Sequence, residues 1–227
     1  MVRATISADI VSSTSLSMEE LTLLQSEIRR FLDELSEKSQ GQDWGRLFKG
    51  DSVEIFLHDP KHALRTALLL KALVKKTILS KDKTAKWMLF KRYGVRLAIG
   101  IGEMRMANRE QDILDGEAIY ISGRLLESQQ KSGRDKSSIK RSMFFGCKDA
   151  LFAEQMGVIL ELLDSLLKET TIRQSEILYY KLLGNNEEEI AKNLLIKQST
   201  VNQQSRSFSW NAIESAVNYF EKLNFEP

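Results

Sequence analysis

The chain has 227 residues, of which 42% are hydrophobic and 28% are charged, and its formal net charge is +2. This composition is ordinary for a soluble globular protein with one large domain or two smaller ones. The one cysteine, Cys147, excludes an internal disulfide and favours a reducing compartment. The N-terminus lacks a signal-peptide pattern, and no apolar run approaches the roughly 20 residues that span a bilayer. We therefore expect a cytoplasmic protein without a membrane partner.

Charge is distributed unevenly along the chain. Between Lys71 and Arg96 there are nine basic residues and one acid, Asp82, whereas from Thr170 to the end there are six basic and seven acidic residues. Phosphate contacts from Lys and Arg supply most non-specific affinity for nucleic acid. Attraction to nucleic acid by net charge alone is therefore not expected in the last part of the chain.

The first part of the chain is expected to alternate strands with helices. Ser17 and Glu20 form a capping box ahead of apolar residues at helical spacing, and Gly50-Asp51 between two strand-like runs favours a hairpin. The expected order is strand Val2–Ile10, helix Met18–Lys38, strands Trp44–Lys49 and Ser52–Leu57, helix Ala63–Leu79, loop Lys81–Arg92, strand Gly94–Gly102, loop or short flap Met104–Asp115, helix Gly116–Lys131 and strand Ser142–Phe145.

This order predicts an α+β domain at residues 1–148, with a ferredoxin-like split βαβ sheet and its helices on one face. From Asp149 the pattern becomes purely helical. Residues 149–169 are expected to form a connector helix with a wide apolar surface. Such a surface is typical of a helix buried between domains or at a dimer contact, although an ordinary core helix fits equally well. Residues 170–227 are expected to form a small all-α domain.

Two carboxylates are expected at neighbouring strand ends. Asp9 ends the first strand, and Asp51 lies at the tip of the predicted hairpin. Two such carboxylates repel each other unless a cation lies between them, and Mg²⁺ commonly uses one or two carboxylates together with phosphate oxygens. The pair is therefore a candidate Mg²⁺ site. Each aspartate also has an ordinary explanation, because strand ends and hairpin tips favour Asp.

Four segments resemble class III adenylyl and guanylyl cyclases, and they occur in the order found in that family. The resemblance implies that Asp9, the Ile10 carbonyl and Asp51 hold metal, that nearby polar residues bind the nucleotide, and that Arg124 braces the transferred phosphoryl group. The segments are ADIVSST at Ala8–Thr14, KGDSVEIF at Lys49–Phe56, RLAIGIG at Arg96–Gly102 and DGEAIYISGRL at Asp115–Leu125, and the nucleotide-binding candidates are Ser12, Ser13, Thr14, Arg46 and Lys49.

The chain departs from this family at residues that matter for catalysis. Tyr120 occupies the asparagine position, Leu47 the adenine-reading lysine position and Ile113 the position of its aspartate partner. Losing one positioned donor typically lowers a rate by about 10²–10³. The stretch Gly116–Arg124 also resembles the SatD-like bacterial family, in which the same departure is expected. We therefore expect a nucleotide-sensing or vestigial domain with little cyclase turnover.

Other catalytic constellations find no support. The only histidines, His58 and His62, lie on either side of Pro60, so they do not share one helix face, and they are interpreted as surface residues. Cys147 is a lone thiol near a strand end and is interpreted as structural.

The last 58 residues resemble the helix-turn-helix of sigma-factor and LuxR-type regulators. Gly184 ends a first helix, Asn186 can cap the short helix Glu187–Leu194, and Leu195–Lys197 forms a three-residue turn. A longer helix then begins at Gln198. Asn and Gln can bond adenine edges, and Lys and Arg can grip phosphates. The DNA-binding candidates are Lys197, Gln198, Ser199, Asn202, Gln203 and Arg206.

These patterns predict a DNA-binding transcriptional regulator with a degenerate cyclase-like domain that senses a nucleoside triphosphate. We expect a homodimer, because a symmetric dimer can present two reading helices to DNA. Two alternatives remain open. The chain could be an active Mg²⁺-dependent nucleotidyl cyclase with a dimerising helical tail, or an interaction module that binds neither DNA nor nucleotide.

Overall fold

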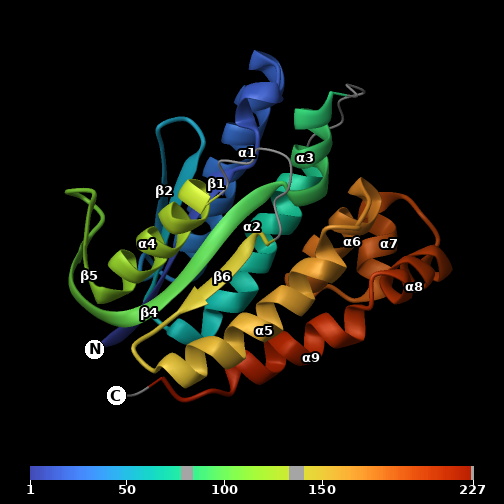
Figure 1. Cartoon of the computed structure of the whole chain (residues 1–227). Helices are drawn as coiled ribbons and strands as arrows, with labels where there is room; N and C mark the ends of the chain where they lie inside the picture. The colour runs from blue at the N-terminus through green and yellow to red at the C-terminus, as the bar shows by residue number, and fades with distance from the viewer. Residues whose placement is uncertain (78–83, 133–140, 226–227) are drawn as a thin grey trace.

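The computed structural model describes residues 1–77, 84–132 and 141–225, and Figure 1 shows a curled sheet followed by a group of helices. The strands are β1 (Val2–Ile10), β2 (Trp44–Phe48), β3 (Ser52–Leu57), β4 (Val95–Asn108), β5 (Ile113–Gly116) and β6 (Met143–Gly146). The helices are α1 (Met18–Lys38), α2 (Ala63–Thr77), α3 (Ala85–Tyr93), α4 (Glu117–Ser132), α5 (Ala150–Leu167), α6 (Ile172–Leu182), α7 (Glu187–Leu194), α8 (Gln198–Ser207) and α9 (Trp210–Glu221).

The sheet is built around β1. Its strands lie in the order β2-β3-β1-β4-β5, each antiparallel to its neighbour, and β6 runs parallel to the first half of β4. β4 is long enough to pair with three strands. Its first half contacts β1 and β6, and its second half curls away to pair with β5. The fold is therefore α+β.

The two faces of the sheet differ because side chains alternate along each strand. On β1, Ala4, Ile6 and Ala8 belong to the main core, which α1 and α2 cover. Thr5 and Ser7 lie on the other face, where both hydroxyls bond the Ser122 hydroxyl of α4, at 3.0 and 2.8 Å. The prediction that all helices of this domain share one face is therefore wrong, since α4 covers the polar face.

Three further expectations about local structure are wrong. The expected basic loop contains α3, which Thr84 caps and which buries Trp87 and Phe90. The expected loop at Met104–Asp115 instead continues β4 to Asn108 and contains most of β5. The expected long last helix is divided into α8 and α9, because Ser209 adopts a left-handed conformation with φ of 59°. The part of the second helix expected at 78–79 lies outside the described residues.

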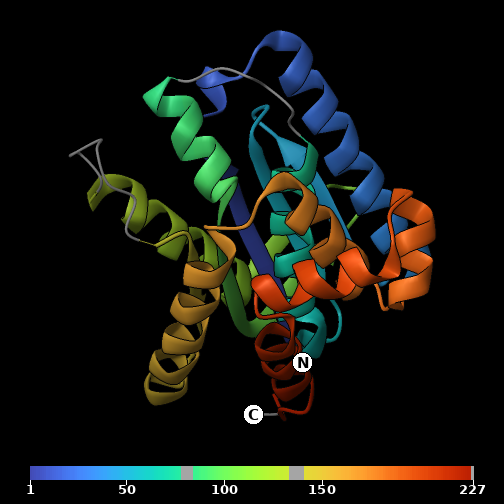
Figure 2. The ribbon, with the colours of Figure 1, turned by 90° about the vertical axis from the view of Figure 1, so that its right-hand side faces the viewer.

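The C-terminal helices pack directly on the sheet domain. α6 lies along α2, and α9 lies below them (Figures 1 and 2). Phe220 of α9 meets Phe145 of β6 at a centroid distance of 6.1 Å, and Arg65 of α2 pairs with Glu221 at 2.6 Å. One continuous apolar core therefore extends across the expected boundary at residue 148.

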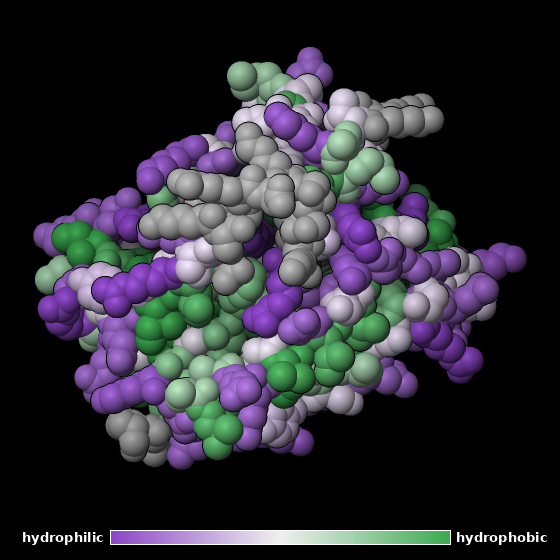
Figure 3. Space-filling model, in the orientation of Figure 1, coloured by the Kyte–Doolittle hydropathy of each residue, from purple (hydrophilic) through white to green (hydrophobic). Residues whose placement is uncertain are grey.

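α5 buries one side and exposes the other. Met156, Leu160 and Leu163 face the core, whereas Leu151, Val158 and Leu162 are 65%, 56% and 63% exposed. Figure 3 shows hydrophobic side chains gathered over the lower half of this face, where α5 runs. The expected homodimer stays a prediction, and this stripe is a surface on which a dimer could form.

A buried polar knot joins α2, α5 and the sheet. The Lys71 ammonium and the Asp164 carboxylate lie 3.3 Å apart, and both side chains are almost fully buried. Lys71 also donates to the carbonyl oxygens of Tyr93 and Val95, and Asp164 accepts from the amide and hydroxyl of Ser142. The charges of Lys71 and Asp164 are therefore compensated. Burial also removes Lys71, which belongs to the basic stretch Lys71–Arg96, from the surface.

Lys75 lies one turn along α2 from this knot. Its Nζ donates to the carbonyl oxygens of Leu167, Arg92 and Lys168, at 2.6, 3.1 and 3.2 Å. Burial, and the charge of Lys71 nearby, lower the pKa of Lys75 to about 7. The helix thus carries a buried amine that titrates close to neutral pH.

We expect the free energy of unfolding to rise as the pH is raised from about 7 to about 9. The folded chain loses the Lys75 proton near pH 7, whereas in the unfolded chain the pKa returns to 10.5. The unfolded state then binds more protons across this range, so stability rises by up to about 1.4 kcal/mol per pH unit. Urea titrations across the range measure this slope. Lys75→Met should flatten it, and an unchanged slope in that variant would rule out Lys75 as its origin.

No helix in the described part of the chain is long and apolar enough to cross a membrane.

Candidate functional site

The structure brings Asp9 and Asp51 to the same edge of the sheet. Asp9 lies opposite Ser52 in the β1–β3 register, so it is a direct neighbour of the β2–β3 turn that carries Asp51. The amide of Ile10 donates to the Asp51 carbonyl oxygen at 2.9 Å. The strand pairing therefore places both carboxyl groups beside the segment that follows β1.

That segment is a tight serine-rich turn. Ser12 has a φ of 53°, and Ser13–Ser15 form a single 3-10 turn. The Ser13 hydroxyl donates to Asp51 Oδ2 at 2.8 Å, which orients the Asp51 carboxylate toward the turn. Thr14 and Lys49 are exposed at the same edge. Four of the expected nucleotide-binding residues, Ser12, Ser13, Thr14 and Lys49, thus belong to the two turns at this edge, and Ser13 is a partner of Asp51.

Arg96 is a residue at this edge that sequence reasoning missed. It lies opposite Asp9 in the β1–β4 register, and its guanidinium is 3.5 Å from Asp9 Oδ2. Both side chains are mostly buried, and Arg96 Nε has no hydrogen-bond partner among the described atoms. The sequence signal that could have identified Arg96 is a charged residue in an otherwise apolar strand, because a largely buried charge needs a partner.

This ion pair bears on the expected Mg²⁺. A cation at Asp9 would have to compete with the guanidinium of Arg96. One carboxylate oxygen of Asp51 also accepts a hydrogen bond from the Ser13 hydroxyl. The Arg96–Asp9 ion pair therefore makes this edge a poor fit for a resident metal.

Arg46 is occupied by structural contacts. It lies opposite Glu54 in the hairpin and bonds that carboxylate with Nε and Nη2, at 2.8 and 2.6 Å. It also pairs with Asp112, in the β4–β5 turn, at 3.1 Å. Arg46 therefore ties the two hairpins together across the polar face. A phosphate would have to compete with both acidic partners for the Arg46 guanidinium, and the expected role of Arg46 in nucleotide binding stays a prediction.

Tyr120 and Arg124 lie on the exposed side of α4. The Tyr120 hydroxyl donates to Asp115 and accepts from Arg105 at 3.1 Å. The guanidinium groups of Arg105 and Arg124 lie over the Tyr120 ring, 5.9 and 5.8 Å from its centre. Tyrosine thus fills the position at which the family resemblance implies a catalytic asparagine, and its hydroxyl is already bonded on both sides.

In the C-terminal part, the short helices α7 and α8 are joined by the three residues Leu195–Lys197. Asn186 caps α7, and Leu195 ends it in a left-handed conformation with φ of 53°. Ile190, Ala191 and Val201 are buried where the two helices meet, which fixes the angle of α8. α6 and α9 contact the pair, and α8 lies at the right-hand edge of the molecule in Figure 1.

The expected DNA-binding residues of α8 fall into two groups. Lys197, Ser199, Gln203 and Arg206 are exposed. Gln198 and Asn202 instead donate to the Glu187 carboxylate, at 2.6 and 3.3 Å. Burial works to raise the pKa of Glu187, but hydrogen bonds from Lys181, Asn202 and Gln198 outweigh it and hold that pKa below its ordinary value. Sequence reasoning missed Glu187 because its partners lie on another helix.

Comparisons with known proteins add little. No protein-family model matches the chain, and no curated protein matches it significantly. Among solved structures, one bacterial light-regulated adenylyl cyclase shares 13% identity over 64% of this chain and 43% of its own, with a TM-score of 0.42. Another shares 16% identity over 63% of this chain and 74% of its own, with a TM-score of 0.41. The chain spans less than half the length of the first, and similarity this weak supports no inference about function.

Proposed function

We propose that the chain is a DNA-binding transcriptional regulator, that α8 reads the DNA and that the sheet domain binds a nucleotide as a control ligand. The observation that carries the proposal is the α7–α8 pair, with a three-residue turn and a polar helix on the outside of the molecule. In this motif the second helix enters the major groove with its N-terminal residues toward the bases.

The exposed residues of α8 supply the chemistry that DNA reading requires. Gln203 and Ser199 can bond base edges, whereas Lys197 and Arg206 carry the charges that phosphates attract. Asn202 is less suited to base reading than the sequence indicates, because its amide is held by Glu187. Gln203 is therefore the first candidate for base discrimination.

The sheet domain suits binding better than cyclisation. Its order β2-β3-β1-β4, with α1 and α2 on one face, supports the ferredoxin-like interpretation. Tyr120 stands at the asparagine position and Arg96 neutralises Asp9, so two parts of the implied catalytic apparatus are altered. Binding of a control ligand does not require either of these two catalytic features. An active cyclase is accordingly the weaker candidate.

A pair of substitutions in α8 tests DNA reading. Gln203→Ala should weaken binding to a selected sequence by about 1–3 kcal/mol and leave binding to a scrambled duplex nearly unchanged. Arg206→Ala should weaken both alike and reduce the salt dependence by about one counterion. Fluorescence anisotropy at several salt concentrations measures both effects, and circular dichroism checks that each variant is folded.

Asn202→Ala is the matched control on the same helix. Because Asn202 is tied to Glu187, its loss should discriminate less between the two duplexes than the loss of Gln203. Equal losses on both duplexes for Gln203→Ala would remove α8 as the reading helix. A larger loss of discrimination for Asn202→Ala would instead support Asn202 as a base-reading residue, as the sequence predicts.

A further inference from the structure

A cavity of about 440 Å³ lies on the polar face of the sheet, at the end opposite to Asp9. It forms because β4 curls away after Gly102 to pair with β5, which leaves a hollow beside the start of β1 and the end of β3. Its volume falls within the range of about 300–1,000 Å³ found for small-molecule sites. The lining residues used below are Arg3, Trp44, Phe56, Met104, Arg105 and Arg109.

The cavity has a strongly positive lining. Arg3, Arg105 and Arg109 contribute to it, and none of its lining residues is acidic. Arg105 is paired with Asp115 at 3.1 Å. Arg3, in contrast, bonds only the Val2 carbonyl and the Met1 sulfur, and Arg109 bonds the Ser36 hydroxyl, so neither forms an ion pair within the described residues. Two guanidinium groups are therefore available to an anion.

Part of the cavity lining is apolar and aromatic. Trp44 and Phe56 pair across β2 and β3, with ring centres 6.3 Å apart, and both are nearly buried. Met104 and Met106 line the side formed by β4. Aromatic faces and polarisable sulfur atoms favour a planar ring, and guanidinium groups favour a phosphate in bidentate geometry.

We propose that this cavity binds a nucleoside monophosphate, with the base against Trp44 and Phe56 and the phosphate between Arg3 and Arg109. The assignment deepens the proposed function, on which it rests for the nature of the control ligand. It needs no metal, because the arginines supply the positive charge. It is also separate from the Asp9–Asp51 edge, since Arg3 and Asp9 lie near opposite ends of β1.

The hairpin that covers the cavity is linked to the rest of the sheet domain. Arg46 ties the β4–β5 turn to β3 through Asp112 and Glu54, and Arg105 reaches from the lining to Tyr120 of α4. A ligand between Arg3 and Arg109 would therefore contact an element that is held to both α4 and the β2–β3 hairpin.

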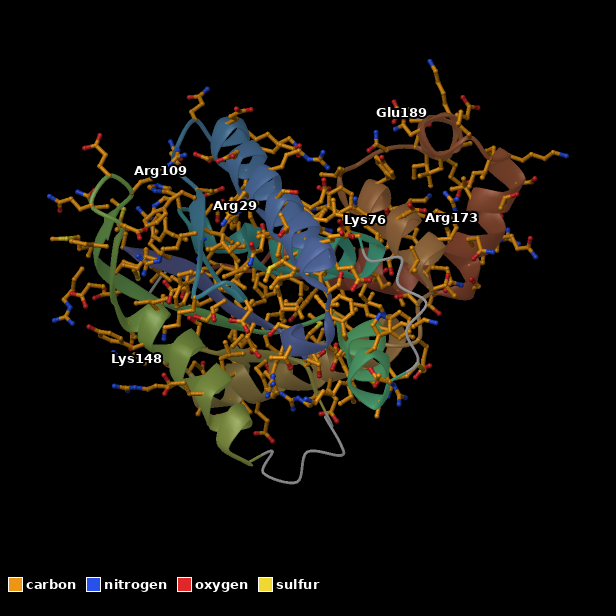
Figure 4. All side chains as sticks on the ribbon, turned by 90° about the horizontal axis from the view of Figure 1, so that it is seen from above. Arg29, Lys76, Arg109, Lys148, Arg173 and Glu189 are labelled. Atoms are coloured by element: carbon orange, nitrogen blue, oxygen red, sulfur yellow. The ribbon has the colours of Figure 1, made fainter. Side chains whose placement is uncertain are left out.

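Isothermal titration calorimetry of the full chain tests the site, with AMP and GMP as probes in EDTA. We expect binding without Mg²⁺, and a loss of affinity of about ten- to a hundredfold in both Arg3→Ala and Arg109→Ala, because each removes a charge-assisted contact. Inorganic phosphate and adenosine alone should each bind more weakly than AMP. Arg29→Ala is the matched control, an exposed arginine of α1 that lies outside the cavity (Figure 4).

Several outcomes would overturn the assignment. They are the absence of binding by either nucleotide, equal loss in Arg29→Ala, and binding that requires Mg²⁺ and disappears in Asp51→Asn while Arg109→Ala retains it. The last outcome would still support nucleotide binding by the sheet domain, but it would place the site at the Asp9–Asp51 edge. DNA binding measured in parallel separates the two proposals. Arg109 and Glu189 of α7 lie on opposite sides of the molecule (Figure 4), so the cavity variants should keep DNA affinity if they fold.

Discussion

Replacing Asp164 with asparagine should lower the free energy of unfolding by about 3–5 kcal/mol, because it leaves the buried Lys71 ammonium without a counter-charge. Burial works to raise the pKa of Asp164, but Lys71 and the hydrogen bonds from Ser142 outweigh it and hold that pKa below its ordinary value. The carboxylate is therefore ionised at neutral pH. The knot it completes joins α5 to α2 and to Ser142, the residue before β6, so its loss should loosen the helical part from the sheet.

Urea unfolding at neutral pH measures this effect. Glu161→Gln is the matched control on the same helix, since its pair with Arg141 at 3.2 Å is exposed and should contribute less than about 1 kcal/mol. The double variant Lys71→Met/Asp164→Leu should recover most of the lost stability, because a buried pair can be replaced by apolar residues at little cost. Similar losses for Asp164→Asn and Glu161→Gln would contradict the role of the knot.

Replacing Gly100 with alanine should destabilise the chain by about 3 kcal/mol. A Cβ at this position would lie 2.2 Å from the carbonyl oxygen of Ala118 and 2.7 Å from the amide nitrogen of Ser122. Both atoms belong to the backbone of α4, which cannot move without breaking the Ser122 contacts with β1. Overpacking against a fixed backbone lies at the upper end of the usual 1–3 kcal/mol.

Gly123→Ala, in α4 itself, is the control. No atom lies within 4 Å of a Cβ there, so alanine should stabilise the helix by about 0.5–1 kcal/mol. Thermal unfolding of the two variants should thus shift in opposite directions. If Gly100→Ala were as stable as Gly123→Ala, the close contact of α4 with the polar face would be wrong.

The elements that could be predicted from the sequence are those with strong local signals. The bounds of β1, α1, β3 and α7 are confirmed, and each has a cap, a turn or a clear period at its ends. For α1 the signal is the Ser17–Glu20 capping box, which the structure contains. Local hydrogen bonds decide such boundaries, so distant parts of the chain do not need to be known.

The elements that escaped prediction depend on tertiary contacts. From the sequence, α3 is interpreted as a basic loop because lysines and arginines surround Trp87, Phe90 and Tyr93. The helical spacing of these three residues is clear only once the structure shows that they are buried. The second half of β4 has a polar sequence because it is largely exposed, and its strand conformation depends on pairing with β5. Propensity is a weak guide where packing decides the structure.

The candidate sites show the same division. The strand ends that carry Asp9 and Asp51 could be placed near each other from motif order, and the structure puts them at one edge. The partners of Asp9 and Asn202 could not, because Arg96 and Glu187 reach them through strand register and helix packing. The arginine-lined cavity has no sequence motif, since its residues come from four strands and from the segments next to them.

The central claim, that this chain binds DNA by sequence, is tested most directly by selection from a random duplex pool. The full chain should enrich one motif at about 0.15 M salt and bind it at least about 10³-fold more tightly than a scrambled duplex of equal length. A chain that enriches no motif and binds both duplexes equally, or binds neither even at low salt, would contradict the claim and favour a helical interaction module.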